Sequence, residues 1–465
     1  MIELDVFAAI VGQRNVLTGA DVEMRDTFWG RHSPCQARAI LRPGSTEEVS
    51  QILKLCHSAG QPVVTHGGLT GLTGAADADS NAIVLSTERM TTIETMDATD
   101  RTAIVGAGVT VQQVQEAADA IGMHFPVDFG ARGSATIGGA ISTNAGGNRV
   151  FRFGSTREQV LGLEVVLADG TIVRSLKGLV KDNTGYDLKH WFIGAEGTLG
   201  IVTRACLRLR TRSNSSMTAL LAVKDFDAIP HLLNRLESDL AGQLSAFEAM
   251  WSSFYKAVSA KADSAHLPAD YPLYVLIEAQ GADQELDQDR FEAVLMTALE
   301  QGMFSDAIIA KSERERQQLW AMRDDIESIF GYGAHADFDV SLPISAMASY
   351  IDDLQTALRE LDPALVCFCF GHVADGNLHV IVAHADGFGE GMEKRITALV
   401  YEPIAAIGGS VSAEHGVGLA KRPYLHLSRS PEELRCMAMM KRALDPLNLL
   451  NPGKILFPEL LSTDM

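Results

Sequence analysis

Several signals that assign a chain to a class are missing from this sequence. Its six cysteines contain no C-x-x-C pair, which argues against a disulfide framework or a zinc ribbon and favours reduced thiols. The N-terminus lacks the basic region of a signal peptide and carries early acids. No apolar run reaches the roughly 18 residues of a membrane span. We therefore expect a cytoplasmic protein that is not an integral membrane protein.

Positive charge is also scarce. There are 39 Lys and Arg against 59 Asp and Glu, a net charge of −20, which argues against nucleic acid as a partner. Proline is sparse as well, with 15 residues against 41 glycines, and many of the glycines fall between residues 60 and 200. Glycine is favoured where backbone approaches a ligand closely, so this region predicts a binding domain. The 465 residues exceed one compact core and predict two or more domains.

The first glycine-rich segment runs from His66 to Gly74 and follows a short apolar strand at 62–65. It matches neither a P-loop, since no Lys-Ser/Thr follows, nor the G-x-G-x-x-G fingerprint. Successive backbone N–H groups in such a loop suit an anion such as a phosphate, although a plain flexible turn is the alternative.

The second segment, 125–147, is the densest in glycine and shows no hydrophobic periodicity long enough for a helix. It alternates small residues with hydroxyls and one amide, which favours backbone pressed against a large, flat ligand with polar edges. The nearby arginines Arg149, Arg152 and Arg157 could approach phosphates.

Composition changes after Ser213, where glycine thins out and amphipathic helices alternate with strands. This pattern predicts an α+β second domain. Its expected helices are 226–240, 287–301, 311–327, 344–361 and 392–407, and a further helix is expected at 431–444.

A β-hairpin is predicted between residues 365 and 382. Asp375-Gly376 suits the two central positions of a type I′ turn, which places His372 directly opposite His379 on one face. Two imidazoles this close suit one metal ion, and two exposed histidines at strand ends are the alternative.

Seven motifs occur in an order that resembles the FAD-linked oxidases of the vanillyl-alcohol-oxidase type. Within them the chain resembles the D-2-hydroxyacid dehydrogenases, a branch that includes D-2-hydroxyglutarate and D-lactate dehydrogenases and the glycolate oxidase flavin subunit. The motifs are Thr65-His-Gly-Gly-Leu-Thr-Gly71, Gly133-Ser-Ala-Thr-Ile-Gly-Gly139, Thr143-Asn-Ala-Gly-Gly147, 192–202, 371–379, 412–418 and Asn451-Pro-Gly-Lys454.

The resemblance implies an α+β fold. A helical segment at 1–32 would precede a two-part FAD-binding domain at 33–212 and a substrate and metal domain at 213–457 that ends in helices. The FAD would be non-covalent. Its implied binding residues are His66, Gly67, Gly68, Leu69, Thr70, Gly71, Pro126, Gly133, Ser134, Thr136, Gly138, Gly139, Asn144, Gly146, Gly147, Glu196, Gly197, Ile201 and Asn451.

The same resemblance implies a divalent metal, zinc by analogy, bound by His372, His379 and Glu414. His415 would be the base that takes the substrate hydroxyl proton, and Arg323 would bind the substrate carboxylate. Hydride would then pass to flavin N5. The implied reaction oxidises a D-2-hydroxy acid to the 2-oxo acid.

Three positions depart from the pattern of D-2-hydroxyglutarate enzymes, where polar or basic groups hold the second carboxylate. Here they are Glu327, Asp337 and Ile381, which predicts a preference for a monoacid such as D-lactate. The alternatives are a D-2-hydroxyglutarate dehydrogenase, a glycolate-oxidase-like flavin subunit of a complex, a non-redox alkyl-glycerone-phosphate-type synthase and a zinc hydrolase without flavin. Electron-transfer flavoprotein, quinone or cytochrome is the expected electron acceptor, and a homodimer is expected by analogy.

Overall fold

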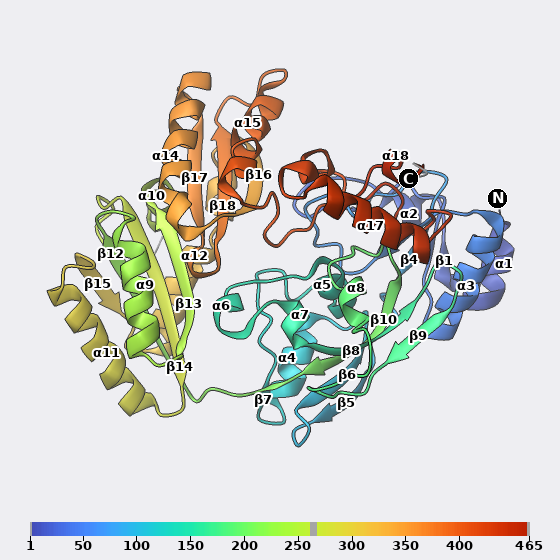
Figure 1. Cartoon of the computed structure of the whole chain (residues 1–465), viewed down its shortest axis with the longest axis horizontal. Helices are drawn as coiled ribbons and strands as arrows, with labels where there is room; N and C mark the ends of the chain where they lie inside the picture. Colours follow the sequence, from blue (N-terminus) through green and yellow to red (C-terminus); the bar gives the residue numbers. More distant parts are fainter. Residues whose placement is uncertain (1, 261–266, 463–465) are drawn as a thin grey trace. The chain divides into compact units, whose positions relative to one another are not determined.

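The computed structural model describes residues 2–260 and 267–462 and divides the chain into two compact units (Figure 1). Unit 1 contains the residues up to Gly147, Gly154–Arg212 and the residues from Glu414 onward, and unit 2 contains Asn148–Phe153 and Ser213–Ala413. The boundary after residue 212 coincides with the one expected from composition. The tail differs, because residues from Glu414 onward pack in unit 1 and not with the rest of the expected second domain.

Unit 1 has a four-stranded sheet in the order β1-β2-β4-β3, in which β2, β4 and β3 are parallel. The helix α3 connects β2 to β3, and Ser45 begins it by accepting a hydrogen bond from the Glu48 N–H at 3.2 Å. These elements are α1 (Leu4–Val11), η1 (Gln13–Asn15), β1 (Val16–Leu17), α2 (Ala20–Glu23), β2 (Ala39–Leu41), α3 (Thr46–Ala59), β3 (Val63–His66) and β4 (Ile83–Ser86).

The second sheet of unit 1 is antiparallel, in the order β5-β6-β10-β8-β9, and its apolar side chains form one continuous core with α4 and α5. The remaining elements of unit 1 are β5 (Ile93–Asp97), β6 (Thr102–Gly106), α4 (Val111–Asp119), β7 (Met123–His124), α5 (Ile137–Thr143), α7 (Thr156–Gln159), β8 (Val160–Val166), β9 (Ile172–Ser175), α8 (Lys189–Phe192), β10 (Ile201–Arg208), β11 (Arg210–Thr211), η3 (Arg422–Leu427), α17 (Pro431–Leu444) and α18 (Glu459–Ser462).

The expectation that 125–147 contains no helix is wrong, because α5 occupies residues 137–143. The Thr136 hydroxyl caps it by accepting from the Gly139 N–H at 3.3 Å, and Asn144 ends it in the left-handed conformation. Gly138 brings its backbone so close to Ala107 that a Cβ there would lie 2.8 Å from the Ala107 Cβ. Close packing and capping, and not an apolar stripe, therefore stabilise this short helix.

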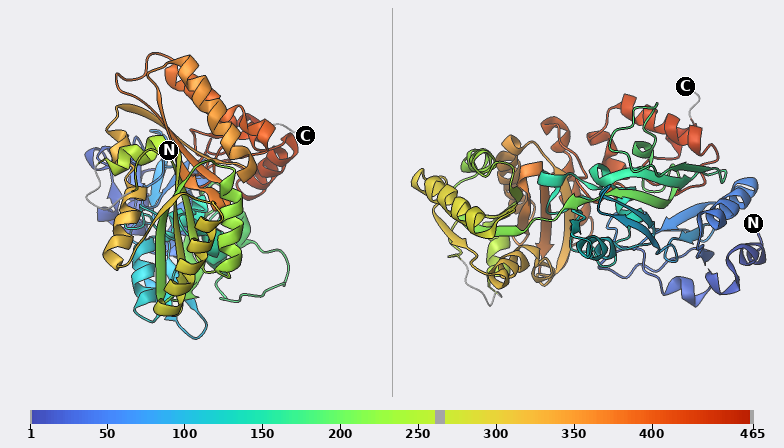
Figure 2. Two further views of the ribbon diagram at one scale, coloured as in Figure 1. Left: turned by 90° about the vertical axis from the view of Figure 1, so that its left-hand side faces the viewer. Right: turned by 90° about the horizontal axis from the view of Figure 1, so that it is seen from below.

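Unit 2 is built on one seven-stranded antiparallel sheet in the order β15-β12-β14-β13-β17-β18-β16 (Figures 1 and 2). Its elements are α6 (Val150–Phe153), β12 (Ser215–Val223), α9 (Ala228–Asp239), β13 (Leu244–Trp251), α10 (Ser252–Ser259), β14 (Leu273–Gly281), α11 (Gln284–Glu300), β15 (Asp306–Ile309), α12 (Glu313–Asp324), α13 (Glu327–Phe330), β16 (Ala334–Ser341), α14 (Ile344–Leu361), β17 (Val366–His372), η2 (Val373–Asp375), β18 (Asn377–His384), α15 (Met392–Tyr401) and α16 (Ile404–Ile407).

One face of this sheet packs against the helices α10, α12 and α13. Side chains from β14, β13, β17 and β18 form an apolar cluster with them, which includes Tyr274, Met250, Phe370, Ile381, Phe254 and Leu319. Because side chains alternate along a strand, every second residue of these strands lies on this face. The face is apolar along most of its length and becomes polar near one end of the strands.

The predicted hairpin exists, but its predicted register is wrong. Phe370, and not His372, lies directly opposite His379. Residues 373–376 form a four-residue loop that begins with the 3-10 turn η2, and of the two expected central residues only Gly376 has a positive φ, 87°. His372 and His379 are thus diagonal neighbours on the same face and not an opposed pair.

Two predicted helices are interrupted. The helix expected at 311–327 ends at Asp324 and is followed by the short α13, and the one expected at 392–407 is divided into α15 and α16 at Pro403. Among the described residues, none of the helices combines the length and the apolar character that a transmembrane span requires.

Candidate active site

Two histidines and two acids form the polar end of the sheet face in unit 2. Glu248 on β13 lies directly opposite His372 on β17, and Asp339 on β16 lies directly opposite His379 on β18. Each histidine therefore lies opposite a carboxylate on a neighbouring strand, His372 on the β13 side and His379 on the β16 side. The two imidazole rings meet edge to face with their centroids 5.4 Å apart. Diagonal placement still brings the rings close enough for both to approach one small ligand or ion.

Glu248 binds two partners in the interior of the unit. His372 Nδ1 lies 2.7 Å from Glu248 Oε1. Arg323 Nε donates a hydrogen bond to Glu248 Oε2 at 2.9 Å, and Arg323 Nη2 forms an ion pair with the same oxygen at 2.9 Å. Burial alone would raise the pKa of Glu248, but the charges and hydrogen bonds of His372 and Arg323 outweigh it and lower the pKa to about 2. Glu248 is therefore ionised at neutral pH.

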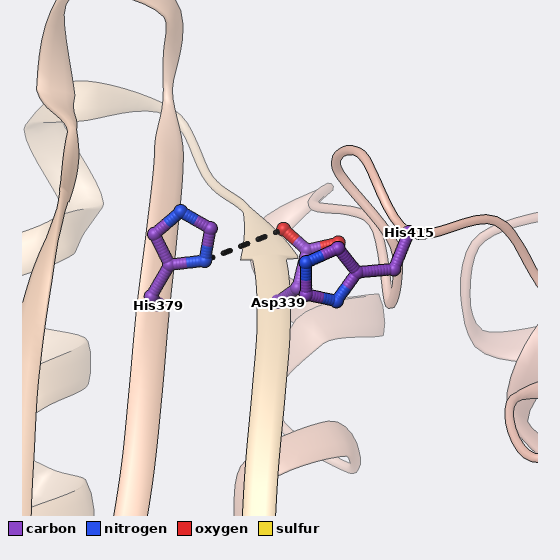
Figure 3. A group of neighbouring side chains, drawn as sticks. All are labelled: Asp339, His379 and His415. Carbon is purple, nitrogen blue, oxygen red and sulfur yellow. Dashed lines mark ion pairs between the residues drawn. The ribbon is translucent and has the colours of Figure 1, made fainter. Parts of the chain in front are cut away.

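Asp339 organises the neighbouring strand end. Its Oδ1 accepts a hydrogen bond from Asn377 Nδ2 at 2.9 Å and lies 3.9 Å from His379 Nδ1, and its Oδ2 accepts from the Ala413 N–H at 3.2 Å. Figure 3 draws Asp339 and His379, with their ion pair dashed, together with His415. Ala413 is the last residue of unit 2, so Asp339 fixes the point from which the chain continues directly into Glu414 and His415.

Arg323 is in the last turn of α12 and is only 5% exposed, so its ion pair with Glu248 is buried and not a surface contact of a charged helix. Its guanidinium carbon also lies 5.2 Å from the centre of the Phe370 ring. Its Nη2 lies 3.5 Å from His372 Nε2. A cationic donor group thus lies beside His372.

The surface next to the histidines along the strands is apolar. Phe370 and Ile381 are buried in the cluster beneath α12, and the Phe370 and His379 ring centroids are 5.0 Å apart. Asp337 lies directly opposite Ile381 on β16, is exposed, and pairs at 3.7 Å with His335. Glu327, at the start of α13, is exposed. None of these three positions supplies a cation.

In unit 1 the two glycine-rich segments lie against each other. A Cβ on Gly67 would lie 2.7 Å from Thr136 Oγ1, and a Cβ on Gly68 would overlap the Ser134 carbonyl oxygen. The loop at 66–71 and the start of α5 therefore form one surface that tolerates no side chain at these two glycines. Binding of a phosphate-bearing cofactor by the backbone N–H groups of this loop stays a prediction.

Strained backbone gathers in the same motifs. Eight non-glycine residues of the described chain have a positive φ, and four of them are predicted cofactor residues. Strain of this kind persists where the surroundings enforce it and is concentrated at binding sites. The four are Leu69 (56°), Asn144 (52°), Glu196 (48°) and Asn451 (42°).

His66, at the end of β3, is fully buried. Its Nε2 lies 2.8 Å from the Ala76 carbonyl oxygen, and its Nδ1 has no hydrogen-bond partner among the described residues. Burial lowers the pKa of His66 to about 4, against the opposing effect of the Ala76 carbonyl. The imidazole is therefore neutral and donates from Nε2, which leaves Nδ1 as an acceptor.

Glu196 and Asn451 form hydrogen bonds with backbone groups of unit 1. The Glu196 carboxylate accepts hydrogen bonds from the Val417 and Gly418 N–H groups at 2.6 and 2.8 Å. Asn451 Nδ2 donates to the Glu196 carbonyl at 2.8 Å, and Asn451 Oδ1 accepts from the Thr65 N–H at 2.9 Å. These bonds explain why the residues after 414 pack in unit 1. They also fix the ends of two predicted cofactor loops.

The other predicted residues of unit 1 divide into loop and core positions. Ile201 lies in the hydrophobic core at the start of β10 and is 1% exposed. The Gly147 N–H donates to Glu414 Oε1 at 2.6 Å, so the second glycine-rich segment ends at a predicted metal ligand. Pro126 is buried, and the loop residues are Thr70, Gly71, Gly133, Gly146 and Gly197.

Sequence reasoning did not single out Glu248 or Asp339 as site residues. Each has a signal in the chain. Glu248 is the single charged residue of the apolar strand at 244–251, and Asp339 is fully buried between Phe338 and Val340. An isolated acid inside a buried strand must be paired, and this requirement points to a site.

Replacing Gly68 with Ala tests the glycine surface in unit 1. The added methyl group would overlap the Ser134 carbonyl, so we expect loss of most bound FAD and a fall of about 1–3 kcal/mol in the free energy of unfolding. The absorbance ratio at 450 and 280 nm and a thermal melt measure the two effects. Gly389→Ala is the matched control, because a Cβ there meets no atom within 4 Å. Full flavin content in Gly68→Ala would contradict the assignment of this loop.

Comparison with known proteins identifies the families to which the two parts of the chain are similar. Residues 37–175 match the FAD binding domain family and residues 212–455 match the family of FAD linked oxidases, C-terminal domain. A D-2-hydroxyglutarate dehydrogenase of Xanthomonas citri pv. viticola is 40% identical over an alignment that covers 94% of this chain and 93% of that enzyme. A putative mitochondrial D-lactate dehydrogenase of Schizosaccharomyces pombe is 34% identical and covers 97% and 89%.

The fold extends to more distant proteins. A crystal structure of p-cresol methylhydroxylase with substrate bound has a TM-score of 0.77 at 17% identity and covers 99% of this chain and 97% of its own. This likeness confirms the expected fold of the vanillyl-alcohol-oxidase type. From the two family matches and the relatives together, the chain belongs to the FAD-linked oxidases, in their D-2-hydroxyacid dehydrogenase branch, and is an FAD-dependent oxidoreductase.

Proposed function

We propose that this protein oxidises a D-2-hydroxy monoacid such as D-lactate to the 2-oxo acid, with the help of a divalent metal ion. The observation that carries the proposal is the polar end of the sheet face in unit 2, where His372 and His379 lie with ring centroids 5.4 Å apart and Arg323 lies beside His372. Imidazole and carboxylate ligands with one open position are typical of a catalytic metal site. Zinc is the expected ion.

The proposed ligands are His372, His379 and Glu414. Glu248 accepts a hydrogen bond from His372 Nδ1, so His372 Nε2 carries the lone pair that would bind a metal. The Ala413 N–H donates a hydrogen bond to Asp339, so the residue directly before Glu414 is fixed at this strand end. The donor set therefore fits a divalent metal.

Each residue has a distinct task in the proposed reaction. Arg323 holds the substrate carboxylate, for which a planar guanidinium is suited. An imidazole nitrogen of His415 takes the proton of the substrate hydroxyl as general base. When bound, FAD supplies the acceptor for the hydrogen on the substrate Cα, and the metal supplies a Lewis acid at the hydroxyl. The glycine loops of unit 1 hold the FAD without a covalent bond, in line with the buried position of His66.

The preference for a monoacid rests on the apolar surface beside the histidines. A second carboxylate placed along β18 would meet the buried Ile381 and, opposite it, the acid Asp337. Burying an unpaired carboxylate there costs several kcal/mol. The methyl group of D-lactate carries no such penalty.

A D-2-hydroxyglutarate dehydrogenase is the second candidate, because the relative at 40% identity carries that name. A substrate panel separates the two. With an artificial electron acceptor we expect kcat/KM for D-lactate, D-2-hydroxybutyrate or D-mandelate to exceed that for D-malate and D-2-hydroxyglutarate by about tenfold or more, equivalent to at least about 1.4 kcal/mol. A preference for the diacids would reject the monoacid proposal and select the second candidate.

A double variant sharpens the panel. Changing Ile381 to Asn and Asp337 to Lys places an amide and a cation on the two opposed positions, so we expect the ratio of diacid to monoacid kcat/KM to rise. Glu402→Lys, at an exposed site after α15, is the control for added charge. Anaerobic addition of the preferred acid should also bleach the flavin band, whereas a non-redox synthase or a subunit that needs a partner would leave it unchanged.

The surroundings of the reaction are part of the same proposal. Reoxidation would use an electron-transfer flavoprotein, a quinone or a cytochrome, and the protein would act in the cytoplasm as a homodimer.

A further inference from the structure

Glu248 contacts both the proposed metal ligand His372 and the proposed carboxylate-binding residue Arg323. It is in the middle of β13 and is 1% exposed. Each of its two oxygens has a different partner, with Oε1 facing His372 and Oε2 facing Arg323. One carboxylate thus determines where two groups of the site lie relative to each other.

A role in stability alone does not account for this arrangement. A buried ion pair contributes little to stability, because removing both charges from water costs about as much as their attraction returns. Glu278, on the adjacent strand β14, illustrates a structural carboxylate of the same sheet face. It is fully buried and its partners include Arg149, Arg316 and the Trp320 Nε1–H, with no ion pair to a histidine among the described residues.

We propose that Glu248 is a positioning residue that couples metal binding to substrate binding. This inference rests on the metal-assisted function proposed above. By accepting the hydrogen of His372 Nδ1, Glu248 selects the tautomer in which Nε2 carries the lone pair and orients the ring. By accepting the Nε hydrogen of Arg323 and pairing with its Nη2, Glu248 fixes the plane of the guanidinium. The metal ligand and the carboxylate anchor are therefore held at one separation.

Substituting Glu248 with Gln separates these tasks while preserving size. An amide has one acceptor oxygen, so it can accept from His372 or from Arg323 but not from both, and its NH₂ group then faces a donor. We expect the affinity of the metal-free protein for Zn²⁺ to fall roughly 10- to 100-fold, the usual effect of removing a partner of a metal-bound histidine. We also expect KM for D-lactate to rise, since Arg323 is no longer fixed.

The primary measurement is the Zn²⁺ affinity of the flavin-loaded, metal-free protein, by competition with a chelating indicator and without substrate. Glu278→Gln is the matched control, because it removes a buried carboxylate from the same face without touching a histidine, and its Zn²⁺ affinity should equal that of the wild type. Flavin content and a thermal melt report folding for every variant. Glu248→Asp, which keeps the charge and shortens the reach, should give an intermediate affinity and serves if Glu248→Gln does not fold.

His372→Ala distinguishes the two levels of the proposal. If the wild type binds Zn²⁺ tightly and His372→Ala does not, the metal site stands, and unchanged affinity in Glu248→Gln would then overturn the role of Glu248 alone. If neither the wild type nor His372→Ala binds Zn²⁺, the metal-assisted function and the inference fall together. Equal losses in Glu248→Gln and Glu278→Gln would also overturn the inference, because they would indicate a general effect of removing a buried charge.

Discussion

His415→Gln should lower the rate of flavin reduction by D-lactate about 10²- to 10⁴-fold, the range in which a positioned general base contributes. Glutamine retains a polar side chain but cannot take the hydroxyl proton. Because the substitution removes no proposed metal ligand, Zn²⁺ affinity and flavin content should remain at wild-type levels. Anaerobic stopped-flow measurement at 450 nm gives the rate directly.

The control for this variant is His426→Gln, because His426 is an exposed histidine in η3 whose Nδ1 lies 3.0 Å from the Pro423 carbonyl oxygen. It should reduce flavin at the wild-type rate. A His415→Gln enzyme within tenfold of the wild type would show that another group takes the proton.

His379→Ala should remove most of the bound metal and slow turnover about 10²- to 10³-fold. A metal ion contributes several kcal/mol to stabilising developing charge, and each 1.36 kcal/mol corresponds to a factor of ten in rate. Elemental analysis of the purified protein measures the metal, and millimolar Zn²⁺ should restore part of the activity by mass action.

His384→Ala provides the matched control, because His384 ends the same strand β18 and pairs with Asp362 at 3.5 Å. It should retain metal and activity. Wild-type metal content in His379→Ala would remove His379 from the ligand set.

The sequence predicts that two histidines lie on either side of a hairpin turn, but it does not predict which residues lie opposite each other. His372 and His379 stand on either side of an Asp-Gly pair, and a hairpin follows from those few residues alone. The register does not, because the Gly376 carbonyl accepts the Leu342 N–H from the end of β16 at 2.8 Å, and this contact belongs to the loop observed at 373–376. The sequence of the hairpin alone predicts a two-residue turn, because it gives no information on this contact with β16.

Long-range pairing also hides Glu248. Its partner His372 is 124 residues away in the chain, and only the β13–β17 ladder brings the two together. The same limit applies to α5, whose cap and close contact with Ala107 depend on packing. Apolar strands and glycine loops are readable from composition, whereas the buried acids that orient the site depend on which strands become neighbours.

The return of the chain to unit 1 after Ala413 has a consequence for biosynthesis. Asn451 forms a hydrogen bond with Thr65, which is 386 residues earlier in the chain. The carboxylate of Glu196 likewise needs the N–H groups of Val417 and Gly418 as partners. Unit 2, apart from residues 148–153, is continuous from Ser213 to Ala413 and is synthesised before those partners are. Unit 1 is therefore completed only after unit 2 has been synthesised, and acquisition of the flavin is expected to await synthesis of residues 417–451.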